Sequence, residues 1–204
     1  MPAPRWLRSQ LSGPHGWLAR PMAHLLNRGN RSSYAHALAR LSTGPGDHVL
    51  ELGFGGGLAL PPLLASGAHV TGVEPAVAMR ARALRKHAWD IAEGRLQILD
   101  ARAEALPDGP FTHALSLNTV YFWDDVPAGM AELHRTVRGT VLLGVSSPEH
   151  LVHMGFPDSG FRVEPPAFYG DALADAGFTV RLEPPDAEPG CTLVIGVRRA
   201  YSSR

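Results

Sequence analysis

The chain has 204 residues, of which 45% are hydrophobic and 19% charged, a composition that is typical of one globular α/β domain and excludes a largely disordered chain. Its formal net charge is zero and its pI is near 7.2, so no overall positive field is available to hold nucleic acid. One cysteine, Cys191, excludes an internal disulfide, and no apolar run approaches the length of a transmembrane helix, so we expect a soluble cytoplasmic protein.

The N-terminal segment is basic and has a helical pattern. Residues 1–46 hold six arginines and no acidic residue. Apolar residues recur twice at helical spacing, at Leu18, Met22 and Leu25 and again at Tyr34, Leu38 and Leu41. We therefore expect an N-terminal helical extension or lid, residues 1–42, ahead of a main domain, residues 43–204. The extension is either a solvated helical surface or a lid that contacts an anionic or membrane-associated substrate, and in the second case Tyr34 would touch the substrate. A transit peptide is a third interpretation, which the scarcity of serine disfavours.

The first strand and the turn behind it form the most informative stretch. His48–Leu52 indicates a buried strand that runs into a glycine turn over residues 53–57, and residues 58–66 indicate a helix. A dinucleotide motif G-x-G-x-x-G would need its third glycine where Leu58 stands, and no Lys-Ser/Thr pair follows as in a phosphate-binding loop. The strand instead carries Glu51, whose carboxylate would repel a pyrophosphate and attract an ammonium or sulfonium group.

Two more acidic residues stand at predicted strand ends. Residues 69–74 predict a second strand that ends in Glu74, about twenty residues beyond the glycine turn, the spacing that places a carboxylate on a ribose. Residues 95–101 predict a third strand with Asp100 at its end. Because parallel strands present their carboxyl ends at one edge of an open α/β sheet, we expect the acids in one crevice. On the helix after the second strand we expect the stripe Val77, Ala81, Leu84 and Ala88 to face the sheet, with Met79 off it.

An aromatic run follows the fourth predicted strand, residues 111–118. That strand ends in Asn118, and Tyr121, Phe122 and Trp123 come directly after it. Large rings outside a strand are informative when they are exposed, so we interpret them as the lining of an acceptor pocket. The alternative is that the rings pack the loop onto its own helix.

The C-terminal third completes the predicted sheet. Residues 139–145, 178–182 and 191–198 predict three further strands, and residues 168–176 predict a helix. The fold class is therefore α/β, a Rossmann-like seven-stranded sheet, mostly parallel with an antiparallel C-terminal hairpin strand, and with helices on both faces. His150 and His153 lack a third ligand at suitable spacing, so we assign no metal.

The run Glu51-Leu-Gly-Phe-Gly-Gly-Gly57 resembles the first motif, E/D-x-G-x-G-x-G, of the class I S-adenosylmethionine (SAM) dependent methyltransferases. Asn118-Thr-Val-Tyr-Phe-Trp123 is similar to a small-molecule branch of the ubiquinone and menaquinone biosynthesis type. The resemblance covers roughly residues 41–145. It implies that the first acid contacts the amino group of SAM, the second the ribose, and the third the adenine. The implied cofactor-binding residues are Glu51, Gly53, Phe54, Gly55, Gly57, Glu74, Pro75, Met79, Asp100, Ala101 and Asn118, and we assign Tyr34, Tyr121, Phe122 and Trp123 to the substrate.

The expected activity is methyl transfer to a small organic acceptor by in-line displacement at the sulfonium of SAM. Such an enzyme mainly positions the reactants and excludes water, which can lower a barrier by roughly 7 to 11 kcal/mol. Tyr121 is the candidate for a group that deprotonates or orients the acceptor. We expect a small-molecule substrate, no nucleic acid, a lipid contact only through the basic arm, and a monomer or homodimer. Two alternatives stay open: a non-catalytic protein that binds SAM or its demethylated product SAH, and an NAD(P)-dependent reductase.

Overall fold

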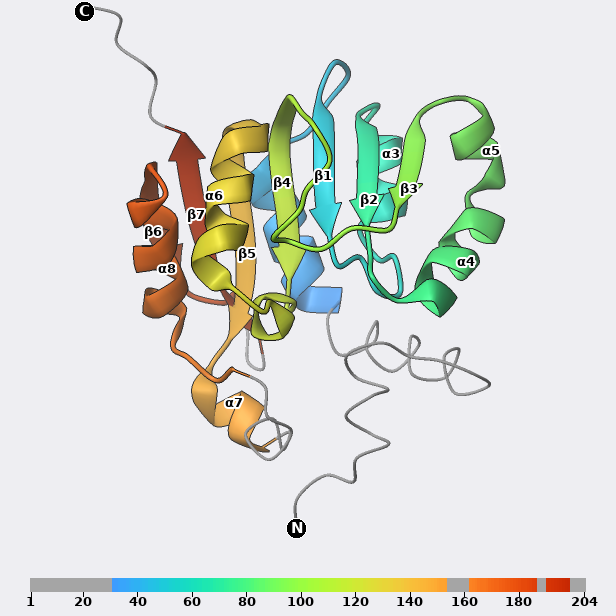
Figure 1. Ribbon diagram of the computed structural model, residues 1–204. Coiled ribbons are helices and arrows are strands. Elements are labelled where there is room, and N and C mark those ends of the chain that lie inside the picture. Colours follow the sequence, from blue (N-terminus) through green and yellow to red (C-terminus); the bar gives the residue numbers. More distant parts are fainter. Residues whose placement is uncertain (1–30, 154–161, 187–189, 199–204) are drawn as a thin grey trace, which may run out of the picture.

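The computed structural model describes residues 31–153, 162–186 and 190–198. Within them one sheet has the strand order β3-β2-β1-β4-β5-β7-β6 (Figure 1). The strands are β1 (His48–Leu52), β2 (His69–Val73), β3 (Leu96–Leu99), β4 (Phe111–Leu117), β5 (Val137–Ser146), β6 (Phe178–Glu183) and β7 (Cys191–Arg198). β7 runs antiparallel to both of its neighbours, β5 and β6, and the other neighbouring pairs are parallel. The predicted fold class is confirmed.

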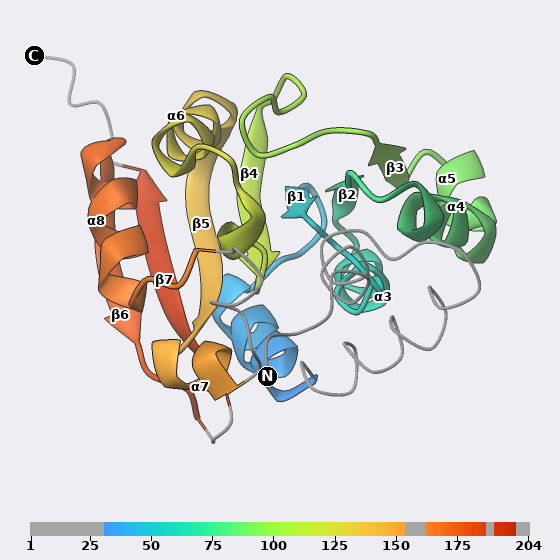
Figure 2. The same ribbon diagram turned by 60° about the horizontal axis from the view of Figure 1, so that its bottom comes forward.

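Helices cover both faces of this sheet. They are α3 (Leu60–Ala65), α4 (Val77–Lys86), α5 (Ala88–Ala92), the single turn η2 (Val120–Phe122), α6 (Val126–Thr136), α7 (Pro148–His153) and α8 (Pro166–Asp175). One core cluster joins the sheet to α6 and α8, and the other joins it to α3, α4 and a helix that spans residues 31–41 (Figure 2). No helix of the described residues is long and apolar enough to cross a membrane.

The helix over residues 31–41 packs into the main body of the fold. Its residues Tyr34, Ala37 and Leu41 are buried in the same core cluster as α3. Its His36 contacts the carboxylate of Glu183 at the end of β6, with 3.0 Å between Nε2 and Oε1. The second of the two predicted N-terminal helices therefore covers the sheet. The first, around residues 18–25, lies outside the described residues.

The strand order indicates where on the sheet a ligand would bind. The chain leaves β1 toward β2 on one side, and β4 joins β1 on the other, so the order reverses between β1 and β4. In open α/β sheets a ligand binds outside the carboxyl ends of the strands at such a reversal. The carboxyl ends of β1, β2 and β4 carry the glycine turn, Glu74 and Asn118, which the sequence had singled out.

The expected buried stripe of α4 is wrong. Val77 is 71% exposed and Leu84 is 46% exposed, whereas Met79 and Ala83 are buried, with His87 one further turn along. Residues four apart lie on one face of a helix, so the Met79 face is the one that packs on the sheet and α3. The apolar pattern misleads because α4 lies near the end of the sheet and buries only a narrow stripe (Figure 1).

Candidate functional site

The glycine turn brings backbone close to the end of β4. Gly53 has a φ of +64°, and a Cβ there would lie 2.6 Å from the Thr119 methyl group, so only glycine fits. Its amide donates a 2.8 Å hydrogen bond to the Val73 carbonyl at the end of β2. Gly55 and Gly57 also have positive φ. The turn thus forms a closely fitted floor between β1, β2 and β4.

Glu51 is a buried acid without a partner. The residue lies in β1 at the centre of the sheet and is 1% exposed. Neither oxygen of its carboxylate has a hydrogen-bond partner in the described structure. Burial, and then the charge of Glu74, raises the pKa of Glu51 to about 8. A buried carboxylate is costly unless a cation or hydrogen-bond donors satisfy it. The site is therefore built to receive a positively charged or donating group.

Tyr34 reaches the same region from the helix over residues 31–41. The residue is buried, and burial, followed by the charges of Glu51, Cys191 and Glu74, raises the pKa of its phenol well above the ordinary value. A neutral phenol beside carboxylates can donate a hydrogen bond, but it brings no positive charge to balance theirs. Tyr34 thus lies beside the predicted cofactor residues, and its assignment to the substrate stays a prediction.

Glu74 at the end of β2 holds the glycine turn. Its two carboxylate oxygens accept hydrogen bonds of 2.9 Å from the amides of Gly55 and Ala76. Burial raises the pKa of Glu74, while these two hydrogen bonds and Arg80 lower it. Each oxygen keeps a further lone pair for a ligand hydroxyl. Pro75, which follows, is exposed at the rim.

Arg80, which the sequence did not single out, connects the second and third acids. Its guanidinium donates a 2.6 Å hydrogen bond to the Glu74 carbonyl and a 2.7 Å hydrogen bond to the carboxylate of Asp100. The Asp100 side chain is 69% exposed, and Ala101 beside it packs partly against the core. The three acids thus lie at the ends of three adjacent strands, with Asp100 at the open rim. An arginine six residues after an acid carries no sequence signal of this bridge.

Asn118 is the centre of a polar network at the end of β4. It has a φ of +57°, and its Oδ1 accepts from the Tyr121 hydroxyl at 2.9 Å and from the Ser146 hydroxyl at 3.0 Å. The Cys191 thiol donates to the same oxygen at 3.3 Å. Ser146 and Cys191 were not predicted, because they meet only through the antiparallel register of β5 with β7.

The expectation that the aromatic run is exposed is wrong. Tyr121 is 3% and Trp123 is 8% exposed, and both belong to the core cluster that contains α6 and α8, with Phe122 packed against it. The Tyr121 hydroxyl accepts a 2.5 Å hydrogen bond from the Ser146 amide. The ring of Tyr121 lies edge-on to that of Tyr169, with 6.4 Å between the ring centroids. Burial raises the pKa of Tyr121 well above its ordinary value. Whether these rings contact an acceptor stays a prediction.

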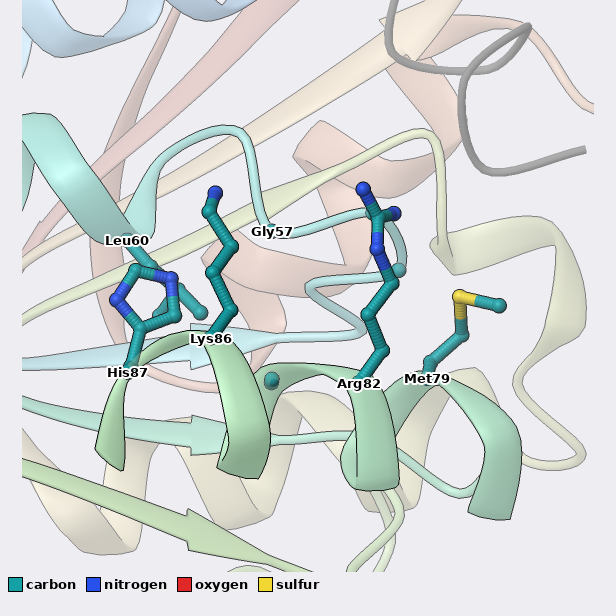
Figure 3. A pocket seen from close by; sticks show the side chains of 9 residues that line it. Gly57, Leu60, Met79, Arg82, Lys86 and His87 are labelled. Carbon is teal, nitrogen blue, oxygen red and sulfur yellow. The ribbon is translucent and has the colours of Figure 1, made fainter. Parts of the chain in front are cut away.

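The remaining predicted residues flank the turn. Phe54 is buried inside it, and Met79 lies on α4 beside a narrow pocket that the turn itself lines (Figure 3). Among the described residues no three His, Cys, Asp or Glu side chains gather as a metal site.

Comparisons with known proteins agree with this geometry. The profile of a family described as a methyltransferase domain matches residues 50–143. The uncharacterized methyltransferase YrrT of Bacillus subtilis (strain 168) is 40% identical over 78 residues, which are 38% of this chain and 34% of that protein. The match therefore spans about a third of the length of this curated relative.

Solved structures share the fold. A chain of the complex that contains the Haloferax volcanii Trm112 methyltransferase activator matches with a TM-score of 0.76 and 22% identity, over 92% of this chain and 96% of that chain. Magnesium protoporphyrin IX methyltransferase from Synechocystis PCC 6803, with bound SAH, matches with a TM-score of 0.67 and 20% identity, over 96% and 93%. These identities establish the fold alone.

The fold and the matched domain define a Rossmann-like methyltransferase domain. Over residues 50–143 the chain therefore resembles the class I SAM-dependent methyltransferases.

Proposed function

We propose that this protein binds SAM and transfers its methyl group to a small organic acceptor. The observation that carries the proposal is the buried carboxylate of Glu51, which has no partner in the described structure and lies in β1 just before the glycine turn. SAM brings an ammonium and a sulfonium, and either charge would lower the cost of ionising this acid. A pyrophosphate would raise that cost, which disfavours a nicotinamide cofactor.

The positions of the acids support the cofactor roles that the resemblance implies. Glu51 would take the ammonium, and the free lone pairs of Glu74 would take the ribose hydroxyls. Asp100, exposed at the rim, would take the adenine amino group, with Ala101 and Met79 beside it. The bound cofactor supplies an electrophilic methyl group.

The chain's own contribution is positioning in line and the exclusion of water. Asn118 is fixed by three side-chain donors, so it can hold the methionine end of the cofactor without rearranging. Tyr121 is a poor base because its hydroxyl already donates to Asn118 and its pKa is raised by burial. We infer that it positions Asn118 and that the acceptor arrives as a competent nucleophile. Of the three rings assigned to the acceptor, Phe122 is the least buried, and it is the one that we expect to contact the acceptor most directly.

Calorimetric titration with SAM, SAH, NAD and NADP tests the binding step. We expect SAM and SAH to bind, and Glu51→Gln to weaken both by tenfold or more, with Glu93→Gln as the control that removes an exposed carboxylate. Binding of NADP without binding of SAM would overturn the proposal. Transfer of labelled methyl from SAM into a metabolite extract then separates an enzyme from a non-catalytic SAM-binding protein.

A further inference from the structure

A narrow pocket lies between the glycine turn and α4, beside the crevice just described. Its volume is about 10 Å³, room for about one water molecule. Figure 3 shows the side chains of Met79, Arg82 and Lys86 on α4, and of His87 directly after it, on the side of the helix that faces the turn. The lining residues are Gly55, Gly56, Gly57, Leu60, Met79, Arg82, Ala83, Lys86 and His87.

Two buried nitrogens of this pocket have no hydrogen-bond partner among the described residues. They are Nη1 of Arg82 and Nε2 of His87. The His87 side chain is only 7% exposed, and its Nδ1 lies 3.2 Å from the carboxylate of Asp90, so Nε2 is the ring nitrogen left for a ligand. Buried polar atoms in folded proteins nearly always have partners. Both nitrogens therefore indicate a group that occupies the pocket.

The charge around the pocket selects an anion. No described residue that lines it is acidic, while Arg82 and Lys86 are cationic. Two acids contact its lining residues, and both have partners. Asp90 is engaged by His87 Nδ1 and by a 2.5 Å hydrogen bond from Arg95, and Glu74 accepts from the amides of Gly55 and Ala76. Arg80, on the same helix, is already paired with Asp100. The positive charge of the pocket is thus uncompensated by the described residues that line it.

We propose that this pocket is an anion-binding site for a phosphate-class oxyanion. Arg82 would donate from its planar guanidinium, Nε2 of His87 would face the oxyanion, and Lys86 would act as a point charge at the mouth. An oxyanion is larger than the one water molecule that the pocket holds as it stands, so its binding would require the long side chains of Arg82 and Lys86 to rotate outward. The oxyanion is either free phosphate or the phosphate of a phosphorylated metabolite. The pocket adjoins the proposed SAM site, because Gly55, Gly57 and Met79 line it, but its charged residues Arg82 and Lys86 are not among the predicted cofactor residues.

Thermal unfolding of the full chain at constant ionic strength tests this site. Phosphate, sulfate and chloride are compared in the wild type, in Arg82→Gln and in Lys86→Gln. Arg85→Gln is the matched control, because it also removes one positive charge from α4 but from an exposed residue that does not line the pocket. Isothermal titration with phosphate and with glucose 6-phosphate then compares the two sources.

We expect saturating phosphate or sulfate to raise the melting temperature by roughly 3 °C over chloride. The affinity should fall at least about tenfold in Arg82→Gln and in Lys86→Gln, and should be unchanged in Arg85→Gln. Tighter binding of glucose 6-phosphate than of phosphate would identify a metabolite as the source. Equal effects of phosphate and chloride, or equal losses in Arg82→Gln and Arg85→Gln, would overturn the proposal. If Arg82→Gln fails to fold, Lys86→Gln, at an exposed position, decides alone.

Discussion

Replacing Glu51 with glutamine should change how the stability of the ligand-free protein depends on pH. The substitution keeps the shape of the side chain and removes its ability to ionise. In the unfolded chain the acid ionises near its ordinary pKa of 4.5, whereas burial raises the pKa of Glu51 to about 8 in the folded protein. Between these values the folded state holds a proton that the unfolded state has lost. Stability from this group therefore falls as pH rises from 4.5 to 8.

The magnitude follows from the two pKa values. A tenfold change in proton affinity corresponds to about 1.4 kcal/mol, so the full penalty above pH 8 is about 5 kcal/mol. Between pH 6 and pH 8 it grows by about 2 kcal/mol. The buried glutamine amide leaves its own polar atoms unpaired, at a cost of about 1 to 3 kcal/mol. Glu51→Gln should thus be more stable than the wild type at pH 8 and lose that advantage toward pH 6.

Urea unfolding at pH 6, 7 and 8, without ligand, measures this difference directly. Glu93→Gln, which removes a carboxylate from the exposed end of α5, controls for the loss of one negative charge. The difference between wild type and Glu51→Gln should grow by about 2 kcal/mol over this range, and Glu93→Gln should follow the wild type. Parallel pH profiles for wild type and Glu51→Gln would show that this acid is satisfied in the folded protein, and the reasoning would fail.

Three further substitutions test the rest of the site. Glu74→Gln should raise the dissociation constant of SAH tenfold or more in calorimetry, because charge-assisted hydrogen bonds are worth roughly 1.5 to 3 kcal/mol each; an unchanged constant would remove the ribose assignment. Gly53→Ala and its control Gly94→Ala should each lower the free energy of unfolding in urea by about 1 to 2 kcal/mol, because both glycines have a positive φ. Only a Cβ at Gly53 would also clash with Thr119, so only Gly53→Ala should weaken the binding of SAH. Tyr121→Phe should lower the methyl-transfer rate without changing how that rate depends on pH. A shift of the alkaline side of the pH–rate profile would instead show that Tyr121 acts as a base. The control Tyr169→Phe removes a buried hydroxyl that has no partner in the described structure and should leave the rate unchanged.

The sequence predicts the strand ends well because their signals are local. Glu51, Glu74 and Asp100 each follow a short apolar run, and a parallel sheet gathers such positions at one edge. Their hydrogen-bond partners are less predictable. The glycine turn suggests a ligand. Only the structure shows that Glu74 accepts a hydrogen bond from the Gly55 amide, whereas the Glu51 carboxylate has no hydrogen-bond partner in the described structure.

The aromatic run could not be placed from sequence because the space for it comes from a glycine in the following helix. Trp123 is buried against Gly129 of α6, where a Cβ would lie 2.7 Å from the ring. A glycine inside a helical pattern was the available signal, and it gains meaning only when the opposing ring is known. The stripe of α4 was misassigned for a similar reason, since Val77 and Leu84 match a buried pattern but the sheet ends before it can cover them.

In the proposed function, the two buried carboxylates would divide the recognition of a ligand between them. Glu74 is satisfied by two backbone amides and by the nearby Arg80, so it can fix the position of a ligand at little cost to the resting protein. Glu51 has no such support, and the neighbouring Glu74 makes its ionisation harder still. A neutral ligand would leave that cost in place, and an anion would increase it. The unsupported acid therefore sets the sign of charge that the crevice accepts, and the supported acid sets where the ligand lies.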